Sequence, residues 1–191
     1  MISSQERSLL RKNVEKYEGR VSHMYLDSRG YVTVGVGHLL ATLEGAQSLP
    51  FLNADSTPAS RQKIADDYKA LKAQPSNKLA SFYKTFTSIH LTDEVIDQLT
   101  DKHIDSFYQE LKVIYADFDE FPQEVKLATF DLIFNLGMSK LKNQWPKFNG
   151  CIARHDWQGA SAECRRRGVS DSRNHYVRDL LIKAANTSTV S

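Results

Sequence analysis

The sequence predicts an α+β protein that is mainly helical, with a small β-hairpin or sheet. Two observations predict this class. Apolar residues recur at helical spacing over most of the chain, whereas residues 23–37 combine a turn sequence with alternating apolar and polar positions. The chain has 191 residues, which is enough for one domain, or for two closely coupled lobes, with a substantial core.

The first predicted helix begins at a capping box and ends at a glycine. Ser3 is a suitable N-cap, and Glu6 follows it at the spacing of a capping box. Apolar residues then recur at helical spacing: Leu10, Val14 and Tyr17. Gly19 is a natural helix stop, so Glu18 is placed in the last turn. The negative end of the helix dipole lies there and favours the protonated form of a carboxyl group.

A hairpin is predicted directly after this helix. Residues 27–30 read Asp-Ser-Arg-Gly, which is typical of a tight turn. The valines of the following strand alternate with Tyr31, Thr33 and Gly35, so we expect a half-buried strand with Thr33 on the face opposite the valines. Residues 23–37 therefore predict an antiparallel hairpin, and a third short strand is left open.

The middle of the chain is predicted to pass from irregular structure into helices. Residues 41–58 contain several proline, asparagine and aspartate residues and predict a long irregular connection. Helices are expected at about 59–73 and 77–87. Thr92 is a suitable N-cap for a further helix of about 24 residues, roughly 36 Å at 1.5 Å per residue. A helix of that length could connect two lobes.

The last third of the chain is predicted to be helical throughout. Pro122 is expected to open a helix and Gly137 to close it, and this helix is apolar nearly all round. We therefore expect it at the centre of the larger lobe. Further helices are predicted around 140–154, 156–167 and 174–186, with a frayed tail after the last of them.

Composition argues against several classes of protein. The formal net charge of +2 is small for a nucleic-acid-binding protein, so no nucleic-acid partner is predicted. No run of 18 or more apolar residues occurs, so stable membrane insertion is not predicted either. The N-terminus lacks the apolar core of a signal peptide. We therefore expect synthesis in the cytoplasm, and action elsewhere only after release or delivery by another factor.

Neither a disulfide framework nor a metal site is predicted. Cys151 and Cys164 are the only two cysteines, and free thiols are favoured over a bond between them, although the bond is left open. The six histidines show none of the ligand spacings typical of metal sites. We therefore predict no metal and no cofactor.

Two carboxylates carry the functional hypothesis. Glu18 and Asp27 have eight residues between them, and alone they could be two solvated surface charges. Their settings differ, however, because a helix end favours a protonated Glu18 whereas an open turn favours an ionised Asp27. Glycoside hydrolysis needs such a pair, one group as acid and the other as base. Thr33 could offer its hydroxyl to hold a water molecule against Asp27.

The spacing of these residues resembles a known catalytic signature. Glu18, Asp27 and Thr33, followed by Gly-Val-Gly-His at 35–38, resemble the pattern of the phage-type lysozymes of the T-even class, glycoside hydrolase family 24. The resemblance implies a two-lobed fold, with a small β-containing lobe at about 15–90 and a helical lobe formed by about 91–191 plus the N-terminal helix. It also implies that Glu18 is the general acid, that Asp27 positions the nucleophilic water and that Thr33 assists it.

The same resemblance implies a substrate and further site residues. The substrate would be the glycan strand of peptidoglycan, cleaved at the β-1,4 bond between N-acetylmuramic acid and N-acetylglucosamine. The protein would act as a monomer, in the periplasm or cell wall. Substrate contacts are implied for Gly37, Leu39, Phe134 and Asn135. Structural support of the cleft is implied for His38, Asn174 and Arg178. A holin, a secretion apparatus or an immunity protein would be a further partner.

Two segments depart from the family pattern, and rival functions stay open. The stretch 41–89 is longer than in the compact phage enzymes, and Arg165–Arg167 has no clear counterpart. We interpret this arginine run as a solvated helix end, with contact to an anionic wall or membrane as the alternative. The rival functions are a lytic transglycosylase on the same substrate and a non-catalytic wall-binding or membrane-active antibacterial module. Phage endolysin, bacteriocin and delivered effector all remain possible contexts.

Overall fold

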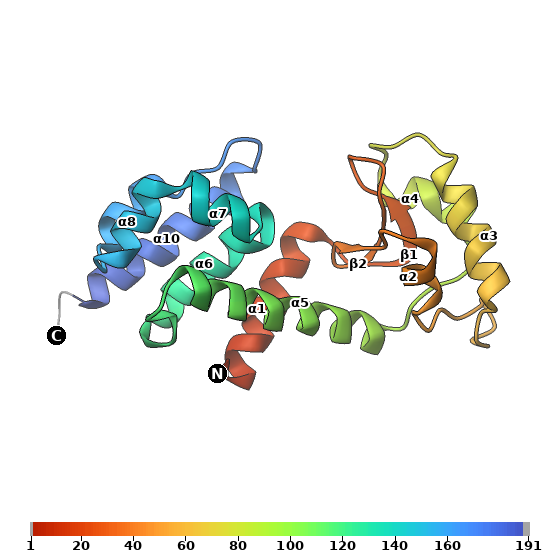
Figure 1. Cartoon of the computed structure of the whole chain (residues 1–191), viewed down its shortest axis with the longest axis horizontal. Coiled ribbons are helices and arrows are strands. Elements are labelled where there is room, and N and C mark those ends of the chain that lie inside the picture. The colour runs from red at the N-terminus through yellow and green to blue at the C-terminus, as the bar shows by residue number, and fades with distance from the viewer. Residues whose placement is uncertain (1, 189–191) are drawn as a thin grey trace. The chain divides into compact units, whose positions relative to one another are not determined.

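The computed structural model describes residues 2–188 and confirms the predicted class, mainly helical with one small antiparallel sheet (Figure 1). The chain divides into two compact units. Residues 18–102 form one, which we call the hairpin unit, and residues 1–17 with 103–191 form the other, which we call the helical unit. Helix α5 (Asp93–Ile114) is continuous, and the division falls within it, after Lys102.

The sheet of the hairpin unit has three strands in the order β1-β2-β3: β1 (Val21–Leu26), β2 (Val32–Gly35) and β3 (His38–Leu39). The predicted turn closes the first hairpin, because the N–H of Gly30 donates to the carbonyl of Asp27 at 3.0 Å. Gly30 has a φ of +80°, which a residue with a side chain rarely adopts. The predicted hairpin is therefore confirmed, and the third strand, which the sequence left open, is also present.

Strand β2 differs from the prediction in its burial. All four of its residues are buried, and Thr33 is only 4% exposed, so the expectation of a half-buried strand was wrong. Helix α3 (Arg61–Lys72) packs against β1 and β2. Ile96 of α5 lies against Gly35, at the position where a side chain would begin. Helix α3 and Ile96, which are distant from β2 in the sequence, thus cover this strand. Its alternation of apolar and polar residues alone had suggested that one face was exposed to solvent.

Gly35 provides a test of this packing. Its φ is +67°, and an added Cβ would lie 3.4 Å from Cγ2 of Ile96. Gly35→Ala is therefore expected to lower the free energy of unfolding by about 1–3 kcal/mol, which chemical denaturation followed by circular dichroism would measure. Gly37→Ala is the matched control, because Gly37 has a φ of +70° but no atom within 4 Å of its added Cβ. Equal losses in both variants would show that the contact with Ile96 contributes nothing.

The stretch predicted as irregular contains a helix. Helix α2 (Leu43–Gln47) lies inside 41–58, and Thr42 caps it by accepting a hydrogen bond from the N–H of Gly45 at 3.1 Å. The cap at Thr42 was a signal that the sequence interpretation overlooked. The remainder is tied into the unit by Leu52, which forms isolated bridges with Pro58 and His90.

The helix predicted at 77–87 is shorter than expected. Its residues form a loop followed by α4 (Ala80–Tyr83) and the 3-10 helix η1 (Lys84–Phe86). Asn77 has a left-handed φ of 60°, which is incompatible with an α-helical start at that residue. The end of α3 at Lys72, by contrast, lies close to the expected position.

The helical unit contains most of the helices: α1 (Ser4–Glu18, of which Glu18 falls in the hairpin unit), η2 (Phe118–Glu120), α6 (Gln123–Leu136), α7 (Met138–Gln144), α8 (Pro146–Ala153), α9 (Trp157–Glu163) and α10 (Asp171–Ser188). The capping box of α1 is confirmed, since the N–H of Ser3 donates to Glu6 at 2.8 Å and the N–H of Glu6 donates to the Ser3 hydroxyl at 3.2 Å. The first helix therefore begins and ends where the sequence predicted.

Other helix boundaries differ from the predicted ones. The helix predicted at 140–154 is two helices, because Trp145 leaves the helical region of φ and ψ and Pro146 opens α8. Helix α10 continues through Ser188, beyond the point where fraying was expected. The rest of that predicted tail, 189–191, lies outside the described residues.

Helix α6 is the buried helix of the helical unit, as predicted, and packs against α10. Its buried side chains are mostly apolar and include two polar ones: Val125, Ala128, Thr129, Phe130, Asp131, Leu132 and Ile133. The core around it is a single cluster that also receives Leu10 from α1 and Val177 from α10. Asp131 is the charged residue among these buried side chains of α6. Because a charged side chain is rarely buried without a partner, its contacts are described below.

Candidate active site

The sheet of the hairpin unit gathers several predicted site residues on one face. Thr33 pairs with Tyr25 of β1 on one side and with Leu39 of β3 on the other. Residues paired across an antiparallel sheet project from the same face, so these three side chains share a face. Asp27 lies two residues beyond Tyr25, and its N–H donates to the carbonyl of Tyr31 at 2.9 Å, continuing the ladder. By the two-residue period of a strand, Asp27 belongs to this face as well.

The turn holds the carboxylate of Asp27 in one orientation. Its Oδ1 accepts hydrogen bonds from the N–H of Arg29 at 2.9 Å and from the N–H of Tyr31 at 2.8 Å. Within residues 2–188, no hydrogen bond reaches Oδ2, and the side chain is half-buried. One oxygen thus fixes the group, and the other is available to orient a water molecule.

Glu18 is held at the junction between α1 and the sheet. It is the last residue of α1, its side chain is half-buried, and Gly19 with a φ of +76° ends the helix. Arg20 anchors the chain directly after this point, because it forms ion pairs with Asp93 at 3.0 Å and with Asp97 at 2.9 Å. The start of α5 therefore positions the segment that carries Glu18, a role for Arg20 that the sequence interpretation missed.

Tyr25 is affected by the charges of both carboxylates. Burial, followed by the negative charges of Glu18 and Asp27, raises the pKa of the Tyr25 phenol to about 12. Both carboxylates therefore lie close enough to the same phenol to disfavour its ionisation. Tyr25 was not among the predicted site residues, although its position two residues before Asp27 in an alternating strand placed it on the same face.

Thr33 occupies a more enclosed position than expected. Its hydroxyl donates a hydrogen bond to the carbonyl of Tyr31 at 3.2 Å. A hydroxyl has one proton to donate and two lone pairs to accept with, so this bond leaves its acceptor capacity unused. The hydroxyl oxygen is therefore able to accept a further hydrogen bond.

The remaining predicted residues of the hairpin unit divide between the two sides of the sheet. Leu39 is exposed and shares the face of Thr33. His38 is half-buried and pairs with Val34, so it lies on the opposite face, where a supporting role is expected. Gly37 is exposed in the turn between the two strands. The sheet thus separates the residue expected to contact substrate from the one expected to support the fold.

Phe134 and Asn135 belong to the helical unit, near the end of α6. Phe134 is half-buried and packs edge-on against Phe107, with ring centroids 5.3 Å apart, and against His103 at 6.4 Å. Burial lowers the pKa of His103, which favours its neutral form. Asn135 is exposed. Their contribution to substrate binding stays a prediction.

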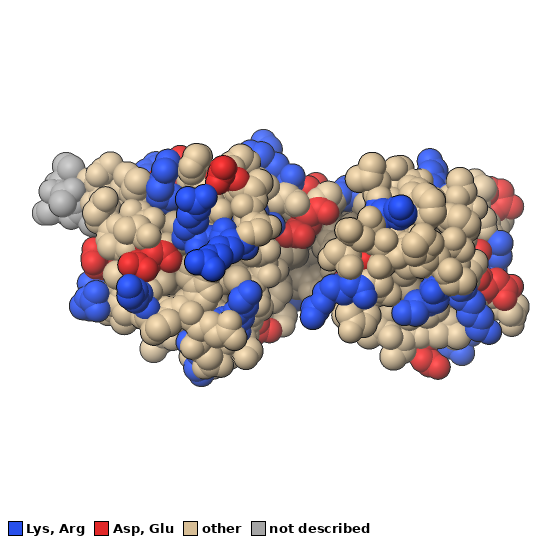
Figure 2. All heavy atoms as spheres, turned by 90° about the horizontal axis from the view of Figure 1, so that it is seen from above, with Lys and Arg blue, Asp and Glu red and all other residues tan. Residues whose placement is uncertain are grey.

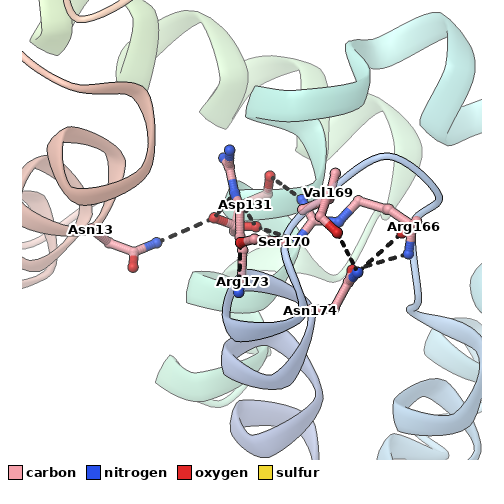
Figure 3. Close-up of polar contacts among 7 residues, drawn as sticks. All are labelled: Asn13, Asp131, Arg166, Val169, Ser170, Arg173 and Asn174. Carbon is pink, nitrogen blue, oxygen red and sulfur yellow. Dashed lines mark hydrogen bonds and ion pairs between the residues drawn. The ribbon is translucent and has the colours of Figure 1, made fainter.

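Asn174 and Arg178 lie on α10 and make different contacts. Asn174 is buried and holds the connection between α9 and α10, because it accepts from the N–H of Arg166 and donates to the Arg166 carbonyl, both at 3.0 Å (Figure 3). Arg178 is exposed and forms an ion pair with Asp179 at 2.8 Å. Asn174 thus supports the local fold of the helical unit, whereas Arg178 faces solvent.

The interpretation of Arg165–Arg167 as a solvated helix end was wrong for its central residue. Arg165 and Arg167 are exposed, but the Arg166 side chain is 1% exposed and forms an ion pair with Asp131 at 2.7 Å. Arg173 approaches the same carboxylate, with its Nε 3.0 Å from Oδ2, and Figure 3 shows both guanidinium groups directed at Asp131. One buried carboxylate therefore neutralises part of two buried arginine charges. A lone aspartate in an apolar helix was the available signal.

The two cysteines carry free thiols and are buried. Burial raises the pKa of the Cys164 thiol, and the nearby guanidinium of Arg166 opposes this shift only in part. A thiol with a raised pKa is a poor nucleophile at neutral pH, so Cys164 does not suit covalent catalysis. Within the described residues, no helix combines the length and apolar character that crossing a membrane requires.

No protein-family model matches the chain, and no curated protein matches it significantly. Two features of the chain therefore indicate its function: the placement of Asp27 and Thr33 on the sheet face of Tyr25, and the resemblance of residues 17–39 to a lysozyme signature.

Proposed function

We propose that the protein is a peptidoglycan hydrolase that cleaves the β-1,4 bond between N-acetylmuramic acid and N-acetylglucosamine. The observation that supports this most directly is that Tyr25, Thr33 and Asp27 share one face of the sheet, with the negative charges of both Glu18 and Asp27 raising the pKa of Tyr25. Two carboxylates in different settings are the chemical requirement of glycoside hydrolysis. The resemblance of this segment to the phage-type signature supports the choice of substrate.

The proposed mechanism is inverting hydrolysis. Glu18, at the negative end of α1, donates its proton to the leaving glycosidic oxygen. The free Oδ2 of Asp27 accepts a proton from a water molecule that also donates to Thr33, and this water attacks the anomeric carbon from the opposite face. One proton leaves Glu18 and one arrives at Asp27, so charge is balanced. Inversion requires roughly 6.5–9.5 Å between the two carboxyl groups.

Tyr25 has a defined part in this scheme. Because its pKa is raised to about 12, the phenol stays neutral throughout the range in which a glycosidase works. A neutral hydroxyl is able to donate a hydrogen bond to a carboxylate without adding a third negative charge. Tyr25 is therefore proposed to position a carboxylate rather than to transfer a proton.

Digestion of purified cell walls tests the proposal. The full-length protein is expected to reduce the turbidity of a wall suspension and to release fragments whose reducing-end muramic acid carries the added water. Mass spectrometry of these fragments identifies the reaction, because a lytic transglycosylase releases anhydro products that are one water lighter. Walls that bind the protein but release no fragments would refute the enzymatic function and support a binding module.

A further inference from the structure

The connection that follows α3 presents two apolar side chains to solvent. Leu79, which immediately precedes α4, is 81% exposed, and Phe82 within α4 is 39% exposed. The N–H of Phe82 donates to the carbonyl of Leu79 at 2.9 Å, so the two residues lie in one turn. We call them the apolar pair. Grouped apolar exposure of this kind often indicates a binding surface.

The exposure of the apolar pair is built into the fold. Tyr83 is fully buried beneath it, and its hydroxyl donates to the carbonyl of Pro75 at 2.7 Å and accepts from the N–H of Lys78 at 3.4 Å. The ring of Phe82 packs edge-on against Tyr83, with centroids 5.2 Å apart. Tyr83 therefore holds the backbone at Pro75 and Lys78, directly before the apolar pair.

Positive charge surrounds the apolar pair. Residues 68–92 contain four lysines and neither aspartate nor glutamate. Lys78 and Lys84 flank the pair and are exposed. Lys72, at the end of α3, donates to the carbonyl of Gly30 at 3.2 Å and so lies beside the β1–β2 turn. That turn adds the exposed Arg29 to the same region.

The figures agree with this arrangement. The β1–β2 turn and the connection from α3 to α4 lie at the top of the hairpin unit in Figure 1, and a Cβ added to Gly30 would lie 3.6 Å from the Cβ of Ser76. Figure 2 views the unit from that side and shows blue groups spread over uncoloured surface, with the larger red groups near the margin. Basic groups are thus spread over this face of the unit.

The two acidic residues that lie directly next to this segment in the sequence, Asp67 and Asp93, are already engaged. Asp67 is buried, accepts from the N–H of Ser88 at 2.7 Å and lies 3.4 Å from Nζ of Lys63. Asp93 forms its ion pair with Arg20. Neither carboxylate is paired with Lys78 or Lys84, the lysines beside the apolar pair.

We infer that this surface, formed by the apolar pair with Arg29, Lys72, Lys78 and Lys84, docks on an anionic lipid bilayer. Lysine and arginine bind anionic headgroups, while exposed apolar side chains enter the boundary between headgroups and acyl chains. An anionic polymer would use the lysines but would leave Leu79 and Phe82 in water. The docking is peripheral, and it is independent of the proposed hydrolysis because it uses neither Glu18 nor Asp27.

Vesicle sedimentation tests the inference. The full-length protein is expected to sediment with phosphatidylcholine vesicles that contain phosphatidylglycerol, and not with vesicles of phosphatidylcholine alone. Charge reversal at Lys78 and Lys84 together is expected to weaken binding by at least about 25-fold, since one basic residue near such a surface contributes about fivefold. Replacing the apolar pair (Leu79→Ser with Phe82→Ser) is expected to weaken it by at least about tenfold.

Matched variants distinguish binding through this surface from non-specific adsorption to vesicles. Val113→Ser removes an apolar side chain that is 62% exposed on α5, and Lys147→Glu reverses an exposed charge on α8, and both are expected to leave vesicle binding unchanged. Leu79→Trp should show a blue shift in emission with anionic vesicles. Absence of vesicle binding would overturn the inference. So would full vesicle binding without the apolar pair, together with polyphosphate binding that needs the lysines, since that result indicates an anionic polymer as the partner.

Discussion

The Glu18→Gln variant is expected to clear cell walls about a hundredfold to ten-thousandfold more slowly than the unmodified protein. Glutamine preserves the size and the half-buried position of the side chain at the end of α1, but it has no proton to give to the leaving oxygen. The measurement is the initial rate of turbidity loss with purified walls, together with the yield of released fragments. Wall binding, measured by sedimentation, should be nearly unchanged.

Two comparisons make this result specific. Glu15→Gln alters another half-buried glutamate of the same helix and is expected to keep full activity. Glu18→Gln should also lower the pKa of Tyr25, because it removes one of the charges that raise it, while burial remains. Tyrosine ring carbon shifts followed over a pH titration would detect this, with Tyr115, whose pKa burial alone raises, as the unaffected reference. Undiminished clearing by Glu18→Gln would exclude Glu18 as the general acid.

The Asp131→Asn variant is expected to lose about 3–5 kcal/mol of unfolding free energy. Asparagine is similar in shape, but it removes the negative charge that the buried guanidinium groups of Arg166 and Arg173 both contact. Urea denaturation followed by tryptophan fluorescence measures the loss. Trp145 and Trp157 both belong to the helical unit, so their emission reports on the unit that contains the substitution.

An exposed ion pair provides the control for Asp131. Asp171 lies 3.3 Å from Arg165, and both side chains are mostly exposed. Asp171→Asn is expected to cost less than about 1 kcal/mol, because water screens such pairs. If Asp131→Asn cost no more than Asp171→Asn, the buried network would not be a source of stability, and its function would need another explanation.

Local sequence signals were sufficient for several features. The Ser3–Glu6 capping box, the turn glycine Gly30 and the stop at Gly19 are confirmed because each depends on neighbours only a few residues away. The burial of α6 is confirmed as well, because a helix that is apolar on nearly every side is stable only when it is buried. Helix boundaries such as Trp145 and Asn77 were less predictable, because a single backbone conformation decides them.

Features that join distant parts of the chain could not be predicted in this way. Whether β2 is covered on one face or both depends on Ile96 and α3, which are remote from it in the sequence. The arginine run was misread for a similar reason, because the partner of Arg166 lies 35 residues away on α6. From sequence alone, an arginine is predicted to be exposed to solvent unless its acidic partner can be identified.

By itself, the sequence determined the fold class, the hairpin with its turn, and the spacing of Glu18, Asp27 and Thr33, because these follow from short-range periodicity and backbone preference. Only the tertiary structure decided that Tyr25 lies close to both carboxylates, that Arg20 anchors the segment behind Glu18, and that Asp131 balances two arginines. Charge and burial act through space, so their effects are set by which side chains the fold brings together.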